Sequence, residues 1–176
     1  RELRANSRGF RRHNGRLPSS VDVSKFKVGG NLAMTPGDVV FRSEQLELIQ
    51  YRPQTAAVHG TPLFIVPPQI NKYYVYDLSP DKSMVGYLLE QGFQVYMVSW
   101  RNPGREHRSW GLDDYVLALD EAIDVCRDVS GAPAVNVVGA CAGGITLATA
   151  VAWLAGRDEL NKVGSLSLMV NVLQPA

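Results

Sequence analysis

The residues with the clearest chemical pattern are Gly139-Ala140-Cys141-Ala142-Gly143. Glycines two positions before and after a nucleophile are typical of a nucleophile elbow, the sharp turn between a strand and a helix that presents a catalytic side chain. Larger residues at Gly139 or Gly143 would clash with the turn or with an adjacent strand. The pattern therefore predicts Cys141 as a nucleophile. The alternative is a small-residue turn around a buried, unreactive cysteine.

A cysteine at this position favours one type of reaction. A serine that accepts an acyl group from a thioester holds it as a less reactive oxygen ester. A cysteine keeps the group as a thioester, which is still activated for a second acceptor. Cys141 therefore indicates acyl transfer from a thioester donor rather than simple hydrolysis.

An elbow also needs two backbone N–H groups for the developing oxyanion. The residue after the nucleophile supplies the first, which here is Ala142. The second comes from the loop after an earlier strand, and the loop after residues 62–66 begins with two prolines, which have no N–H. Gln69, Ile70 or a residue just beyond is then the second donor. Alternatively, this loop is only a rigid turn tied by Asn71.

The general base is not evident from the sequence. Enzymes with this elbow place their acid and then their histidine after the nucleophile, but all three histidines precede Cys141: His13, His59 and His107. His107 follows a predicted strand and could approach the site, although a role in its own loop is the simpler interpretation. Asp113 and Asp114 fit helix caps better than catalytic acids. Asp158 and Glu159 come too soon after the nucleophile to be the catalytic acid, because they lie in the loop that ends the elbow helix.

Apolar patterns predict the elements that position these residues. Continuous apolar runs indicate buried strands, and 3.6-residue periodicity indicates helices. A half-buried strand is expected at 46–51, within a stretch at 26–53 that forms an early antiparallel edge. Further strands are expected at 62–66, 93–100, 134–139 and 165–173, and helices at 81–92, 112–131 and 143–156. Strands alternating with helices predict an α/β fold, with a mostly parallel sheet and helices on both faces.

Composition excludes several classes of protein. The 176 residues carry a formal net charge of +1 and are 45% hydrophobic, which fits one globular domain and indicates no nucleic-acid partner. Two cysteines, with Cys126 in a predicted helix, predict no disulfide framework and a cytoplasmic location. No apolar run is long enough for a membrane span. No metal site or bound cofactor is expected.

Three stretches together resemble a known family. "FIVPPQINKYYVYDLSPDKSMVGYLLEQGFQVYMVSWRNPG", "WGLDDYV" and "VVGACAGG" are similar to the polyhydroxyalkanoate synthases, especially those of class II, which act on medium-chain substrates. The similarity extends over residues 31–173. It implies an α/β-hydrolase core and a Cys-Asp-His triad in which Cys141 is the nucleophile and the Asp and His follow residue 176.

The resemblance also implies substrates and partners. (R)-3-hydroxyacyl-coenzyme A is the expected substrate, coenzyme A the released product and a growing polyester chain the acceptor. A homodimer attached to polyester granules in the cytoplasm is expected. The competing interpretations are a cysteine-dependent depolymerase or thioesterase of the same fold, and a non-catalytic module that binds acyl chains.

The expected domain organisation has two parts. Residues 1–30 form a basic, linker-like segment, with six arginines among the first sixteen residues. A nucleic-acid-binding arm is the alternative for this segment. Residues 31–176 form the first part of an α/β-hydrolase catalytic domain. The sequence starts without methionine and stops directly after a strand-like run, so we expect it to be an internal fragment of a synthase.

Overall fold

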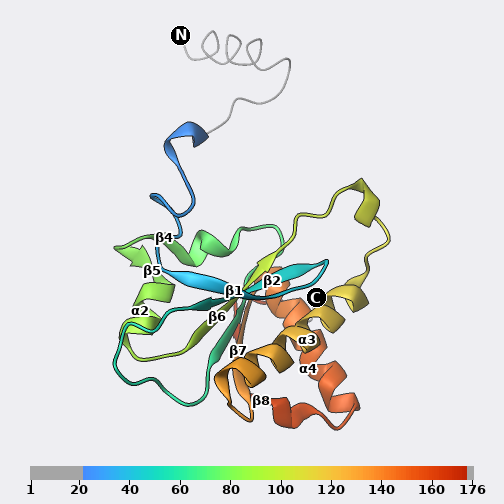
Figure 1. Cartoon of the computed structure of the whole chain (residues 1–176). Helices are drawn as coiled ribbons and strands as arrows, with labels where there is room; N and C mark the ends of the chain where they lie inside the picture. The colour runs from blue at the N-terminus through green and yellow to red at the C-terminus, as the bar shows by residue number, and fades with distance from the viewer. Residues whose placement is uncertain (1–21, 174–176) are drawn as a thin grey trace.

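The computed structural model describes residues 22–173 of the protein. Six strands form one sheet in the order β1-β2-β6-β3-β7-β8 (Figure 1). The β1–β2 and β2–β6 pairs are antiparallel, and the β6–β3, β3–β7 and β7–β8 pairs are parallel. The strand bounds are β1 Gly37–Arg42, β2 Leu46–Tyr51, β3 Leu63–Val66, β6 Val95–Trp100, β7 Val135–Ala140 and β8 Val163–Met169.

Three α-helices cover the two faces of this sheet. They are α2 (Met84–Glu90), α3 (Leu112–Ser130) and α4 (Cys141–Gly156). Figure 1 shows α2 on the opposite side of the sheet from α3 and α4. The connections include four short 3₁₀ turns, η1 (Val23–Lys25), η2 (Tyr73–Tyr76), η3 (Arg105–His107) and η4 (Leu160–Lys162), and a small hairpin of β4 (Asp77–Ser79) and β5 (Lys82–Ser83). The prediction of a mostly parallel sheet with helices on both faces is confirmed.

The hydrophobic core is divided by the sheet into two parts. On β3, the side chains of Phe64 and Val66 pack in the core shared with α3 and α4, whereas Ile65 packs in the core shared with α2. Alternation of this kind follows from the two-residue period of a strand. Because both faces are covered, the strand reads as a continuous apolar run rather than as an alternating one.

The predicted helix at 81–92 was wrong at its start. The helix begins only at Met84, because Ser83 caps it: the Ser83 hydroxyl accepts a hydrogen bond from Gly86 N–H (2.8 Å) and donates one to the buried carboxylate of Asp77 (2.6 Å). Thr35 also donates to Asp77, through its backbone N–H (3.1 Å) and its hydroxyl (2.7 Å). Asp77 therefore ties the start of α2 to the segment that precedes β1.

The predicted strand at 165–173 was wrong at its end. β8 stops at Met169, and Val170 adopts a left-handed backbone conformation with φ 47°. A β-branched residue rarely adopts this conformation, which takes the chain out of the extended path of a strand. Residues 170–173 are consequently a loop, and Asn171 in this loop turns back toward the elbow.

Lys162 links the end of the α4–β8 connection to α3. Its Nζ lies 2.9 Å from Asp120 Oδ1, 2.8 Å from Asp124 Oδ2 and 2.7 Å from Glu159 Oε2, and only 13% of its side chain is exposed. Burial by itself lowers the pKa of Lys162, but hydrogen bonds to the three carboxylates outweigh it and raise that pKa. The bond from Lys162 lowers the pKa of Glu159.

We expect Lys162→Met to lower the melting temperature of the full-length protein by about 2–4 °C at pH 7, because the carboxylates lose their shared partner. A lowered folded-state pKa at Glu159 stabilises the fold above the ordinary carboxylate pKa of about 4.3, and this stabilisation disappears as pH falls through the folded-state value. The difference between wild type and variant should therefore shrink between about pH 5 and pH 3. Lys82→Met, at an exposed lysine that forms no ion pair with any residue in 22–173, is the control. A pH-independent difference in thermal unfolding would contradict this account.

Candidate active site

Cys141 lies at the junction of β7 and α4. β7 ends at Ala140, α4 begins at Cys141, and the cysteine itself has φ 50°. This left-handed conformation is strained for a residue with a side chain, and such strain is common at functional positions. The cysteine is exposed. The predicted strand–turn–helix context is present, with the helix starting two residues earlier than expected.

The glycines around Cys141 lie where other backbone segments approach most closely. A Cβ on Gly143 would overlap the carbonyl group of Pro67, the first residue after β3. A Cβ on Gly139 would lie 2.6 Å from the Cα of Gly144, and one on Gly144 would overlap the side chain of Asn171. Helix α4 can therefore approach the sheet closely only because these three positions have no side chain.

The loop after β3 lies against the start of α4. The Pro67 carbonyl accepts a 2.7 Å hydrogen bond from the buried Trp100 Nε1, which holds this end of the loop. Asn71 N–H donates to the Pro68 carbonyl (3.1 Å), so the amide of Asn71 closes a turn. Asn71 thus ties part of this turn, as the alternative interpretation expected. Because its own N–H is bonded within the turn, the N–H groups of Gln69 and Ile70 are the remaining candidates for the second oxyanion donor. Ala142, the second residue of α4, has a backbone N–H with no partner inside the helix.

Two residues near Cys141 were not found from the sequence. Asn171 Nδ2 donates a 2.7 Å hydrogen bond to the Cys141 carbonyl. Burial raises the pKa of Tyr76, and the nearby Cys141 raises it further. Asn171 was missed because it lies within the strand predicted at 165–173. Tyr76 belongs to the "NKYYVYD" run after the predicted oxyanion loop, and that run was the available signal.

The histidines are occupied elsewhere in the described chain. His107 Nδ1 accepts a 2.8 Å hydrogen bond from Gly104 N–H, and its ring packs on Trp110 with 4.2 Å between centroids. His59 Nε2 lies 3.1 Å from the Gln91 carbonyl. Neither forms a hydrogen bond with Cys141 in residues 22–173, and His13 lies outside that range. The structure therefore favours a loop role for His107.

The first turn of α3 bears out one of the two predicted caps. Asp114 Oδ2 accepts a 2.7 Å hydrogen bond from Gly111 N–H and caps the N-terminus of this helix. Asp113, by contrast, makes no side-chain hydrogen bond among residues 22–173.

Within the same range, no group of three His, Cys, Asp or Glu side chains could hold a metal ion, and no helix is long and apolar enough to cross a membrane.

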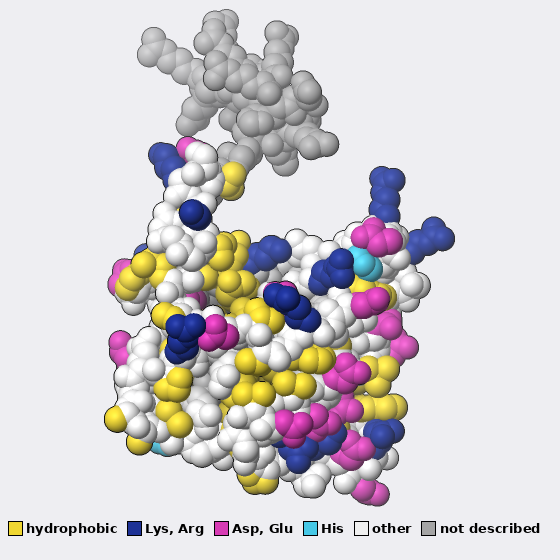
Figure 2. Space-filling model, viewed as in Figure 1, with side chains coloured by type: hydrophobic (Ala, Val, Ile, Leu, Met, Phe, Trp, Pro, Cys, Tyr) yellow, Lys and Arg dark blue, Asp and Glu magenta, His cyan; other side chains and the backbone are white. Residues whose placement is uncertain are grey.

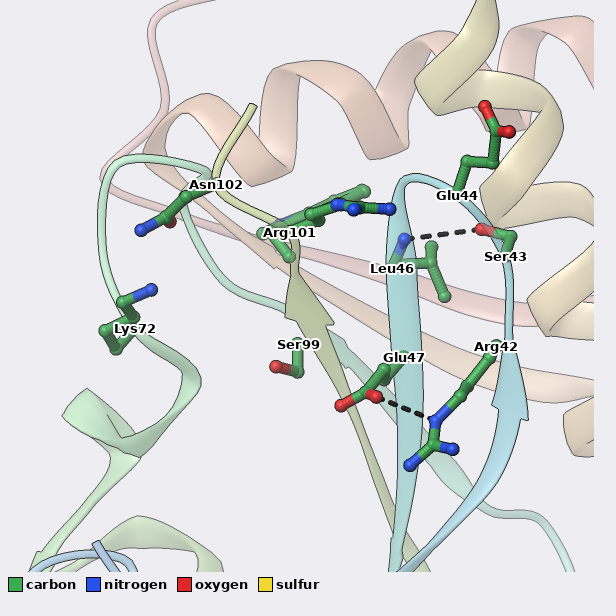
Figure 3. A pocket seen from close by; sticks show the side chains of 10 residues that line it. Arg42, Ser43, Glu44, Leu46, Glu47, Lys72, Ser99, Arg101 and Asn102 are labelled. Atoms are coloured by element: carbon green, nitrogen blue, oxygen red, sulfur yellow. Dashed lines mark hydrogen bonds and ion pairs between the residues drawn. The ribbon is translucent and has the colours of Figure 1, made fainter. Parts of the chain in front are cut away.

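A cleft of about 420 Å³ lies at the carboxyl end of β6 and includes Lys72, from the segment that follows β3. Its wall includes Lys72, Trp100, Arg101, Asn102 and the Arg42–Glu47 ion pair (2.8 Å), as Figure 3 shows for all of these except Trp100. Acidic and basic groups are both present, and charges of both signs are also mixed over the molecular face in Figure 2. The cleft therefore has no strong preference for one sign of charge, and its lining does not include Cys141.

The two cysteines should differ sharply in reactivity. Cys126 is fully buried in α3, and burial raises the pKa of its thiol, whereas Cys141 is exposed. Because the thiolate is the reactive form, iodoacetamide should alkylate Cys141 at least about 100-fold faster than Cys126 in the folded protein. Peptide mass spectrometry over a time course measures both rates. Unfolding in urea should remove the difference, and equal rates in the folded protein would contradict the assignment.

The fold and the elbow define an α/β-hydrolase domain. The chain belongs to the alpha/beta hydrolase fold family, whose model matches residues 59–168. Solved structures agree on the fold: a putative lipase from Sulfolobus solfataricus (TM-score 0.54, 18% identity, 76% of this chain and 49% of that one) and the thermophilic carboxylesterase EstE1 from a metagenomic library (TM-score 0.53, 18% identity, 78% and 46%).

Sequence relatives narrow the resemblance to one group of enzymes. The model described as the N-terminus of poly-beta-hydroxybutyrate polymerase (PhaC) matches residues 3–88. The chain is 53% identical over 162 residues to poly(3-hydroxyalkanoate) polymerase 2 of Ectopseudomonas oleovorans, covering 92% of this chain and 29% of that protein. It is 47% identical over 156 residues to the polymerase subunit PhaC of Cupriavidus necator, covering 88% and 26%. The predicted similarity to polyhydroxyalkanoate synthases is confirmed, and the chain spans less than a third of these relatives.

Proposed function

We propose that the full-length protein polymerises (R)-3-hydroxyacyl-coenzyme A into polyester through an acyl thioester on Cys141. One observation carries the proposal: an exposed cysteine occupies the left-handed turn between β7 and α4 in a chain 53% identical to a poly(3-hydroxyalkanoate) polymerase. The thiol, in place of a serine hydroxyl, keeps the acyl group activated for the next acceptor.

The reaction has two acyl transfers. A histidine from the rest of the full-length protein takes the Cys141 proton, the thiolate sulfur bonds to the carbonyl carbon of the substrate, and coenzyme A leaves with a proton. The hydroxyl of another hydroxyacyl unit then attacks the acyl-enzyme, its proton passes to the same base, and the Cys141 sulfur leaves. Each tetrahedral intermediate carries an oxyanion, for which the N–H of Ala142 and that of Gln69 or Ile70 are the proposed donors.

The remaining properties of the proposal rest on the resemblance. Medium-chain hydroxyacyl groups are the proposed substrates, and a homodimer attached to polyester granules in the cytoplasm is the proposed working form. No bound cofactor takes part, and coenzyme A enters only as the substrate's carrier.

The test incubates the purified full-length protein with 3-hydroxyacyl-coenzyme A and follows two products. Coenzyme A release reports acyl transfer to the enzyme, and polymer isolated from the mixture reports transfer to a second hydroxyacyl unit. Intact-mass spectrometry of quenched samples should detect an adduct on Cys141. Release of free hydroxy acid without polymer would instead identify a depolymerase or thioesterase, and no coenzyme A release would favour a non-catalytic acyl-binding module.

A further inference from the structure

A chain of two hydrogen bonds joins the loop after β3 to the elbow helix. Gln69 Nε2 donates to Thr146 Oγ1 (2.7 Å), and Thr146 Oγ1 donates to the Ala142 carbonyl (3.1 Å). Thr146 is only 3% exposed. These bonds connect residues 77 positions apart in the sequence, and they join the two segments that carry the candidate oxyanion donors.

The direction of this chain is determined by chemistry. A carbonyl oxygen can only accept a hydrogen bond, so Thr146 is the donor in its bond to the Ala142 carbonyl. The Thr146 oxygen is then left as the acceptor for Gln69, whose NH₂ group must face it. Gln69 Oε1 points away and is buried without a partner among residues 22–173.

Gln69 is the side chain that anchors the outer part of this loop. The inner part is held at Pro67 by the bond from Trp100 and by contact with Gly143. Farther out, the Ile70 side chain is 87% exposed and cannot hold its own backbone against the protein. Among the described residues, no other side chain of the turn at 68–71 forms a hydrogen bond across to α4.

We propose that Gln69 and Thr146 are positioning residues for the oxyanion site of Cys141. By tying the Gln69–Ile70 backbone to the first turn of α4, they set the separation between the two N–H donors. The inference rests on the proposed acyl transfer and adds residues that neither contact the reacting atoms nor belong to the elbow motif. Small displacements of such donors have large effects, since a shift of about 1 Å costs on the order of 100-fold in rate.

The decisive variant is Thr146→Val, which keeps the side-chain shape and removes the hydroxyl. Thr146→Ser restores a hydroxyl and should rescue. Thr149→Val is the matched control, because Thr149 Oγ1 makes the same type of bond to the carbonyl four residues earlier (Ile145, 2.9 Å) on the same helix but forms no hydrogen bond to a loop within residues 22–173. Gln69→Met tests the partner, since a thioether side chain of similar length has no N–H group to donate to the Thr146 oxygen.

Two rates separate positioning from general damage. The first is the rate of coenzyme A release from 3-hydroxyacyl-coenzyme A, which needs the oxyanion site. The second is alkylation of Cys141 by iodoacetamide, a displacement that forms no oxyanion. In Thr146→Val and Gln69→Met, kcat for coenzyme A release should fall about 10- to 100-fold with little change in KM, while the alkylation rate stays within about twofold. Thr146→Ser and Thr149→Val should remain near wild type in both.

The outcomes distinguish this inference from the proposed function. If the wild type forms polymer and Thr146→Val matches Thr149→Val, the positioning role is wrong and the proposed function stands. If both rates fall together in Thr146→Val, the threonine supports the elbow as a whole and the inference is again wrong. If the wild type releases coenzyme A but yields only free acid, polymerisation is wrong, and the comparison of variants still decides the positioning role. No coenzyme A release by the wild type overturns both.

Discussion

Cys141→Ala should abolish coenzyme A release and polymer formation in the full-length protein, a loss of at least about ten-thousand-fold. The covalent intermediate cannot form without the sulfur, and no other described thiol is exposed, since Cys126 is buried. Stability should change little, because Cys141 is exposed and packs little surface. Initial rates of coenzyme A release and the melting temperature measure both expectations.

Cys126→Ala is the matched control for the nucleophile. It removes a buried sulfur from α3 and should cost about 1–2 kcal/mol of stability through the small cavity that remains. Its specific activity should stay near that of the wild type. Similar activity losses in Cys126→Ala and Cys141→Ala would remove the functional distinction between the two thiols.

Gly143→Ala is the substitution with the next largest expected effect. Its new Cβ would overlap the Pro67 carbonyl, so α4 and the end of β3 must move apart. Such overpacking against rigid backbone costs about 2–3 kcal/mol, and it displaces both candidate oxyanion segments. Coenzyme A release should fall about 100-fold or more, with a clear loss of thermal stability.

Gly156→Ala is the control for this change. Gly156 lies at the end of the same helix, and a Cβ there meets no atom within 4 Å. This variant should match the wild type in activity and be equal to it or slightly higher in stability, because alanine favours a helix over glycine. A Gly143→Ala protein with wild-type activity would show that the close approach of β3 and α4 is not required.

The elbow could be predicted from the sequence because its determinants are local. Gly139, Cys141 and Gly143 lie within five consecutive residues, and the apolar run before them and the small-residue run after them identify the strand and the helix. The left-handed conformation of Cys141 and the contacts of both glycines agree with that pattern. The reaction that this cysteine performs remains a proposal that the experiments above address.

The ends of elements were predicted less well, again for physical reasons. Residues 81–83 have helical periodicity, but Ser83 instead bonds with Asp77 and caps the helix. Residues 170–173 have strand-like composition, but Val170 turns out of the sheet. In both segments, interactions with residues outside the local window override the local preference.

The sequence by itself determined the class of fold, the position of the candidate nucleophile and the order of the strands and helices from β6 to β8, because periodicity and small-residue spacing are properties of neighbouring residues. Only the tertiary structure decided which distant segments meet the elbow. Placing β3 between β6 and β7 brings Gln69 to Thr146, and the turn after β8 brings Asn171 to the Cys141 carbonyl. These contacts depend on the order of strands in the sheet, which is set by packing across the whole core rather than by any local pattern.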